Sequence, residues 1–134
     1  HSNAQSLEAP RAAMRHDADI ERFLSEHAPG DVVTAPPVVA EIEYGIRRLE
    51  AGSRRRRLLE RESDRVFGPI RVVEWLPGVA SRFGAIKAYL EKAGTPIDDF
   101  DVLIAAFALE HGAKVVSANQ AHFSRVPDLS VVGW

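Results

Sequence analysis

The stretch Pro96-Ile97-Asp98-Asp99-Phe100-Asp101-Val102-Leu103-Ile104-Ala105-Ala106 joins a cluster of aspartates to an apolar run. Apolar residues continue at helical spacing and Gly112 offers the conformation that commonly ends a helix, so we expect a helix over about 100–111. A short apolar strand is expected directly afterwards, over 114–117. In α/β domains, sites lie at the carboxyl ends of the strands and at the helix starts beside them. The acidic start of this helix is therefore a candidate site.

The three aspartates at the start of this helix admit two explanations. Asp98 and Asp101 could serve as helix cap and capping-box partner, which leaves Asp99 unexplained. Alternatively, three carboxylates within four residues repel one another unless a cation or several hydrogen-bond donors compensate them. Mg²⁺ and Mn²⁺ bind such oxygen ligands together with water, and two ions could hold the attacking and leaving oxygens of a phosphodiester. The stretch therefore also predicts a metal site.

On both sides of this stretch, apolar spacing predicts short strands between amphipathic helices. The helix that follows Pro36-Pro37 places its apolar residues on one face, namely Val38, Ile42, Ile46 and Leu49. The order of elements after residue 30 predicts an α/β domain with a mainly parallel sheet. Strands are expected at 31–34, 70–75, 114–117 and 130–132, and helices at 18–27, 36–50, 78–93 and 100–111, with one more through Leu58, Leu59 and Val66.

Length and composition restrict the class of protein. A chain of 134 residues is long enough for one hydrophobic core, and 46% hydrophobic with 27% charged residues is ordinary for a domain that folds in water. No apolar run approaches the roughly 18 residues that cross a bilayer, and no signal pattern is present, so we expect a cytoplasmic protein without membrane contact. Because the chain has no cysteine, any metal must be held by oxygen or imidazole ligands.

Arginines crowd the region from Arg47 to Arg65, although the net charge of the chain is −2. Any surface that binds nucleic acid must therefore be local. Consecutive residues point all round a helix, so a solvated helical face or a surface for a protein partner is the alternative interpretation. The candidates for phosphate contacts are the four consecutive arginines, Arg54, Arg55, Arg56 and Arg57.

Two further polar residues follow expected strands, where a doubly wound sheet places its sites. Glu41 lies one turn into its helix, on the margin of the apolar face, and could instead serve as a helix-start carboxylate that favours the positive end of the helix dipole. Asn119 follows the strand at 114–117 and could supply a neutral oxygen ligand or orient a water, or it could be an ordinary turn residue. Each position is ambiguous when it is taken alone.

Three segments carry a family resemblance, namely Val38-Val39-Ala40-Glu41-Ile42-Glu43-Tyr44-Gly45-Ile46, then Pro96 to Ala106, then Ser117-Ala118-Asn119-Gln120-Ala121-His122-Phe123. In order and spacing they resemble the A-E-I-x-Y-G, D-x-D-x-x-I-A-A and T-x-N/D-x-x-H/D-F patterns of VapC-type PIN-domain ribonuclease toxins, with Ser117 in place of threonine. The closing Val131-Val132-Gly133-Trp134 resembles the last strand of that family. The resemblance covers nearly the whole chain from about residue 6 and implies a PIN-like three-layer α/β/α sandwich.

The resemblance also implies the chemistry of the site. It makes Glu41 and Asp99 acids of the site and Asp101 the principal metal ligand. Asn119 would complete the site and orient a ligand water. These residues would hold one or two Mg²⁺ or Mn²⁺ ions, and a water activated by the metal would attack phosphorus without a covalent intermediate. The run from Arg54 to Arg57 would then bind RNA phosphates.

The same resemblance implies partners. It implies endonucleolytic cleavage of structured RNA, a homodimer, and inhibition by a cognate VapB-like antitoxin of a type II toxin–antitoxin pair, whose C-terminal segment would insert near the site. The competing hypothesis is a catalytically impaired PIN-like module that only binds RNA or a protein, because one acid of the family pattern is missing. A plain α/β domain whose acids are all caps is a third. Binding of Mn²⁺ through the carboxylates would separate the enzyme from the impaired module.

The start of the chain departs from the family pattern, in which a first, central strand ends in an aspartate. His1-Ser2-Asn3-Ala4 is either the remnant of a cleaved expression tag or part of the motif after this strand, with His1 at the place of the aspartate. Residues 5–134 then form a single PIN-like domain, and we expect the first central strand to be absent from this chain. A sheet without that strand exposes inner edges, so we expect extra N-terminal residues, or another chain, to supply it.

Overall fold

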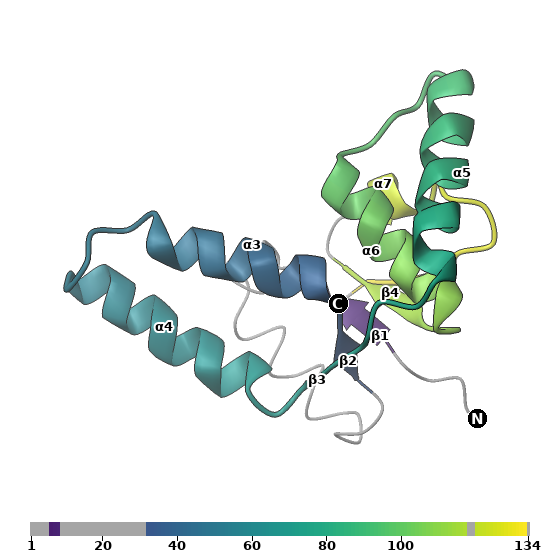
Figure 1. Cartoon of the computed structure of the whole chain (residues 1–134). Coiled ribbons are helices and arrows are strands. Elements are labelled where there is room, and N and C mark those ends of the chain that lie inside the picture. Colours follow the sequence, from purple (N-terminus) through teal and green to yellow (C-terminus); the bar gives the residue numbers. More distant parts are fainter. Residues whose placement is uncertain (1–5, 9–31, 118–119, 134) are drawn as a thin grey trace.

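Short strands alternate with longer helices in this computed structural model, which describes residues 6–8, 32–117 and 120–133, the first three by their backbone alone (Figure 1). The strands are β1 (Ser6–Glu8), β2 (Val33–Thr34), β3 (Arg71–Val72), β4 (Lys114–Val116) and β5 (Val131–Val132). The helices are α3 (Pro36–Arg47), α4 (Arg54–Phe67), α5 (Gly78–Lys92), α6 (Asp99–Glu110) and α7 (Gln120–Phe123).

The strand pairs of the described residues are all parallel. β1 and β5 flank β4 in one sheet, and β2 pairs with β3 in a second. β1 also contacts β2, so the two sheets lie side by side (Figure 1). The carboxyl ends of parallel strands share one edge, which is where α/β folds bind their ligands. At that edge α3 follows β2 and α7 follows β4.

Apolar residues are buried on both faces of the sheet. Val33 and Val115 belong to the main core, together with residues of α3, α5 and α6. Val32 and Val116 belong to a smaller cluster with Ile70. Because successive residues of a strand point to opposite faces, the two clusters lie on opposite sides of the sheet. Burial of both faces is typical of a parallel sheet between helical layers, so the predicted α/β class with a mainly parallel sheet is confirmed.

One prediction about the sheet is wrong, because a first strand is present. Ser6–Glu8 pairs with β4 in parallel, with Ser6 opposite Lys114 and Glu8 opposite Val116. Ser-Leu-Glu contains a single apolar residue, so it lacks the apolar run by which a buried central strand is recognised from sequence. Residues of this chain therefore lie at the place that we expected extra residues or another chain to fill.

α5 and α6 form a closely packed pair of helices. α6 buries Val102 and every residue from Ile104 to Ala108, and α5 packs along it. The predicted helix over 100–111 agrees with α6 to within one residue at each end. Gly112 has a φ of 65°, the left-handed conformation expected directly after a helix. The stretch of sequence that begins with the aspartates therefore forms the central helix of the core.

α3 and α4 form a hairpin that extends away from α5 and α6 (Figure 1). α3 buries Val38, Ile42 and Ile46, as predicted, but it ends at Arg47 rather than near residue 50. α4 buries only Ser63 and Val66, because most of its side chains are charged. The hairpin of α3 and α4 therefore buries fewer apolar side chains than the pair of α5 and α6.

Some expected elements differ from those observed. The strand predicted over 70–75 is reduced to Arg71–Val72, and Trp75 instead packs its ring edge-on against Phe107, with 5.2 Å between ring centroids. Sequence spacing does not predict α7, since four residues are too few for a periodic signal. The predicted helix over 18–27 and residues 1–4 lie outside the described residues. Among the helices that are described, none has the length and apolar character needed to cross a membrane.

Candidate active site

Asp101 lies in the first turn of α6 with its carboxylate half-buried, 18% of the side chain being exposed. Its Oδ2 atom lies 3.4 Å from Nδ1 of His122. His122 belongs to α7, which begins just after β4 ends, so this contact places Asp101 at the carboxyl edge of the parallel strands. Ligands and reacting groups of α/β sheets are found at this edge.

Tight packing holds the backbone of both residues. Val102 and Ile104, which follow Asp101 on α6, belong to the main core. Phe123, which follows His122, is fully buried in the same core. Side chains that project from packed helices keep a defined geometry. The positive end of the α6 dipole also favours a carboxylate in the first turn of that helix.

Asp99 lies on a different side of α6. Its side chain is 61% exposed, and its two carboxylate oxygens lie 3.1 and 3.2 Å from Nζ of Lys87 on α5. Two residues along a helix correspond to a rotation of about 200°, so Asp99 and Asp101 point in different directions. The structure therefore brings Asp99 to α5 and Asp101 to α7.

Glu41 lies in the second turn of α3 and is partly buried. The next residue, Ile42, belongs to the core, so Glu41 lies on the margin of the apolar face, as predicted. The first turn of α3 contains no acid, and the helix dipole acts mainly within that turn. The interpretation of Glu41 as a helix-start carboxylate that favours the dipole is therefore wrong. α3 packs against α6, the helix that carries Asp101.

The acidic start of α6 is not explained by capping. Asp98 occupies the N-cap position, but its side chain makes no capping hydrogen bond. Across residues 6–8, 32–117 and 120–133, no three histidine, aspartate or glutamate residues are grouped so that they could hold a metal ion. Asn119, which we expected to complete the site, lies outside the described residues. The roles of Asp101, Asp99 and Glu41 as metal ligands thus stay predictions.

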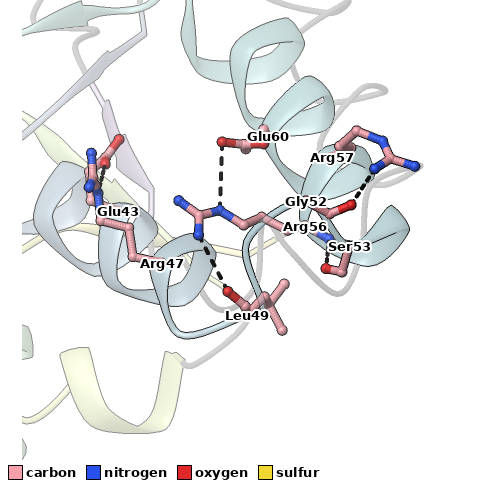
Figure 2. A network of polar contacts seen from close by, with 8 residues as sticks. All are labelled: Glu43, Arg47, Leu49, Gly52, Ser53, Arg56, Arg57 and Glu60. Carbon is pink, nitrogen blue, oxygen red and sulfur yellow. Dashed lines mark hydrogen bonds and ion pairs between the residues drawn. The ribbon is translucent and has the colours of Figure 1, made fainter.

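Two of the four consecutive arginines bind the turn between α3 and α4 (Figure 2). Nη1 of Arg56 donates a hydrogen bond to the carbonyl oxygen of Leu49 at 3.4 Å, and Nη1 of Arg57 donates one to that of Gly52. The backbone N–H of Arg56 donates to the hydroxyl of Ser53, the N-cap of α4, at 3.1 Å. The two guanidinium groups thus satisfy backbone carbonyls of the turn, and the Ser53 hydroxyl satisfies a backbone N–H at the start of α4.

The other two arginines, Arg54 and Arg55, are exposed in the first turn of α4. Arg61, one to two turns further along, is exposed as well. The run of arginines therefore divides into Arg56 and Arg57, which donate hydrogen bonds to backbone carbonyls, and Arg54 and Arg55, for which no such bond is seen among the described residues. The prediction that the four bind RNA as one group does not distinguish these halves, because it depends on spacing alone.

Sequence reasoning missed two residues near this edge. His122 fits the H/D position of the third family pattern, and that position was a usable signal. Thr34, the last residue of β2, is 1% exposed, and its hydroxyl has no hydrogen-bond partner among the described residues. Buried polar groups are usually paired, but a sequence cannot reveal which one is not.

The parallel sheet, with the carboxylate of Asp101 at the edge where its strands end, indicates an α/β protein whose family can be tested by comparison. The model of the PIN domain family matches residues 12–129, and the chain belongs to this family. It is 33% identical over 105 residues to Ribonuclease VapC2 of Haemophilus influenzae, covering 78% of this chain and 76% of that protein. It is 30% identical to the tRNA(fMet)-specific endonuclease VapC of Salmonella typhimurium, covering 70% of this chain and 68% of that protein. The chain is thus a PIN-domain protein of the VapC type.

Solved structures agree with this fold. The crystal structure of DNA-bound VapBC from Salmonella typhimurium superposes with a TM-score of 0.82 at 20% identity, over 97% of this chain and 98% of that chain. VapBC-1 from nontypeable Haemophilus influenzae superposes with a TM-score of 0.77 at 22% identity, over the same shares of the two chains. At these identities the likeness concerns the fold alone. It confirms the PIN-like α/β/α sandwich expected from the sequence.

Proposed function

We propose that the chain is an endoribonuclease and the toxin of a type II toxin–antitoxin pair. Relatives at 33% and 30% identity carry the names Ribonuclease VapC2 and tRNA(fMet)-specific endonuclease VapC. The observation in the structure that supports the proposal most is the half-buried carboxylate of Asp101 beside His122. At the edge where parallel strands end, such a carboxylate can bind a cation or orient a water toward a phosphodiester.

A divalent cation, Mg²⁺ or Mn²⁺, suits the chemistry of these residues. Proteins usually bind Mg²⁺ through one or two carboxylates, and waters and substrate phosphates complete its coordination. We propose Asp101 as the first carboxylate and Glu41, on the adjoining helix α3, as the second. When bound, the cation lowers the pKa of a coordinated water and neutralises charge that develops on the phosphate.

The remaining residues of the proposed site act around these two carboxylates. Asp99 serves as an accessory acid, for which it has to exchange its ion pair with Lys87. Asn119 orients a water with its side-chain amide, which can both donate and accept hydrogen bonds. Asp101 keeps its carboxylate half-buried, and partial exclusion of water strengthens its interaction with any positive charge.

Arg54 to Arg57 are the proposed RNA-binding residues, with a division of tasks. Arg56 and Arg57 hold the turn between α3 and α4 through backbone carbonyls. Arg54 and Arg55 expose their guanidinium groups on the same helix and contact RNA phosphates. Contacts of this kind position the RNA without reading its sequence, and they weaken as salt is added.

The proposed partners are RNA, a VapB-like antitoxin and a second copy of this chain. Two solved structures of similar fold bear the names of VapBC assemblies, which supports an antitoxin. Large apolar side chains that are exposed in the chain, such as Tyr44 at 70% and Trp75 at 52%, suit surfaces that a protein partner covers. The proposed compartment is the cytoplasm, where structured RNA is available as a substrate.

Cleavage of RNA by the purified chain tests the proposal. The protein is stripped of metal with a chelator and incubated with structured RNA, and Mg²⁺ or Mn²⁺ is then added back. We expect endonucleolytic products only in the presence of the cation, and none when a co-purified antitoxin is bound. RNA that is bound but stays intact under all of these conditions would instead indicate the catalytically impaired module.

A further inference from the structure

We infer that His122 is a positioning residue that holds the carboxylate of Asp101 in one orientation for cation binding. The inference rests on the proposed function, because it assigns His122 a task in that site. Its basis is the contact between Nδ1 of His122 and Oδ2 of Asp101 at 3.4 Å, between residues that lie 21 positions apart in the chain.

The backbone of α7 is fixed on both sides of His122. Phe123 is 0% exposed and part of the main core. Gln120, at the other end of α7, places its side chain against the backbone of Gly133, where an added Cβ would come within 2.5 Å of the amide nitrogen. α7 therefore contacts α6 on one side and β5 on the other. The backbone that carries His122 is therefore held at both ends of this short helix, by Gln120 and by Phe123.

The chemistry of the pair sets the direction of the hydrogen bond. An ionised carboxylate can only accept, so the ring must donate from Nδ1, and this nitrogen carries the proton. In the neutral ring, Nε2 is then an acceptor. The carboxylate torsion of an aspartate is broad and has no sharply preferred value. A donor held by the fold narrows that range, because the contact between Nδ1 and Oδ2 favours one orientation of the carboxylate plane.

His122 and Asp101 differ in exposure in a way that agrees with this task. The side chain of Asp101 is 18% exposed, whereas that of His122 is 40% exposed. The imidazole therefore lies nearer the solvent than the acid that it contacts. Residues that orient a metal-binding group through a hydrogen bond typically change metal affinity or activity by about 10-fold to 100-fold when they are removed. A surface contact without this role would change neither.

Mn²⁺ titration of the full chain tests the inference, with the metal alone as the probe. We expect His122→Ala to weaken Mn²⁺ binding by about 10-fold to 100-fold. His122→Asn should restore most of the affinity, since its amide nitrogen lies near the place of Nδ1, and His122→Gln should restore less. His111→Ala is the matched control, because His111 lies at the other end of α6 and bonds the carbonyl oxygen of Glu74. Equal affinity of His122→Ala and the unchanged chain overturns the inference.

A measurement without metal separates failure of the inference from failure of the proposed function. Long-range ¹H–¹⁵N correlation spectra report which ring nitrogen of His122 carries the proton. We expect Nδ1–H in the unchanged chain and a shift toward Nε2–H in Asp101→Asn. If the unchanged chain fails to bind Mn²⁺, the proposed function fails, and the tautomer still decides whether His122 holds Asp101. An Nε2–H ring in the unchanged chain overturns the inference by itself.

Discussion

α6 and α4 are helices of similar length that meet their surroundings in opposite ways. α6 buries six of its 12 residues, whereas α4 buries two of its 14 and exposes a row of arginines. The acid of the candidate site is on the buried helix, and the proposed phosphate contacts are on the exposed one (Figure 1). A reacting centre needs a fixed geometry, but a phosphate contact needs accessible charge and tolerates movement. The proposed function therefore assigns catalysis and phosphate binding to different kinds of helix.

The largest effect is expected at the start of the buried helix. Asp101→Asn keeps the size of the side chain and removes its charge, so cleavage of RNA should fall by at least about 100-fold at a fixed Mg²⁺ concentration. The fold should stay intact, and the melting temperature in metal-free buffer should be equal or slightly higher, since one of three neighbouring acids is neutralised. Initial cleavage rates and thermal melting measure the two expectations.

The matched control for this change lies on the exposed helix. Asp64→Asn removes the same charge from an exposed residue of α4 and should leave the cleavage rate within about twofold, because surface changes of this kind have little effect. Equal cleavage by Asp101→Asn and the unchanged chain would contradict the assignment of the site to α6.

The second largest contrast is expected in stability, between a core position of α6 and a surface position of α4. Ile104 is 0% exposed on α6, and Ile104→Ala should lower the free energy of unfolding by about 2–5 kcal/mol. Leu58 is 49% exposed on α4, and Leu58→Ala should lower it by less than about 0.5 kcal/mol. Urea unfolding measures both. If the first variant does not fold, Ile104→Val, with an expected loss of about 0.5–1.5 kcal/mol, replaces it. Similar losses at the two positions would remove the contrast.

The same substitution, glycine to alanine, should have opposite effects on stability at Gly68 and at Gly84. At Gly68, directly after α4, an added Cβ would lie 2.4 Å from the carbonyl oxygen of Asp64, so Gly68→Ala should destabilise the chain by about 1–3 kcal/mol. At Gly84, in the exposed part of α5, nothing lies within 4 Å, so Gly84→Ala should stabilise it by about 0.5–1 kcal/mol. Thermal melting of the two variants gives the signs, and equal signs would refute this description of the two environments.

The smallest effects are expected for the arginines of α4, where one pair should affect RNA binding and Arg56 should affect stability. Replacing Arg54 and Arg55 by alanine should leave stability unchanged, weaken RNA binding, and reduce the slope of log affinity against log salt by about 1.4. Arg56→Ala should lower the free energy of unfolding by about 0.5–1.5 kcal/mol, because the carbonyl oxygen of Leu49 loses its donor. Filter binding at several salt concentrations and urea unfolding separate the two. RNA affinity that is unchanged in the double variant would exclude the exposed pair from RNA contact.

Some of the fold and the site could be predicted from sequence because the signals are local and periodic. The apolar run after Asp101 predicts α6, and Val38, Ile42 and Ile46 predict the buried face of α3. The strand Ser6–Glu8 could not be predicted, since its place in the sheet depends on pairing with β4 rather than on its own apolar content. Local propensity is a weak guide wherever tertiary pairing decides.

Other features depend on contacts between segments that are distant in sequence. The different surroundings of Asp99 and Asp101 follow from Lys87 on α5 and His122 on α7. The division of the arginine run follows from carbonyl groups that the turn after α3 leaves unpaired. Spacing alone predicts a cluster of acids and a cluster of arginines, but it cannot predict which members of each are already engaged.

Mn²⁺ titration of the unchanged chain beside Asp101→Asn and Asp64→Asn tests the central claim most directly, because it measures the proposed site without depending on the choice of RNA. Calorimetry on metal-free protein should show saturable Mn²⁺ binding by the unchanged chain and by Asp64→Asn. Affinity should be weaker by at least about 100-fold in Asp101→Asn. Equal Mn²⁺ affinity in all three proteins, or no binding by the unchanged chain, would contradict the claim that the start of α6 holds the reacting centre of a metal-dependent ribonuclease.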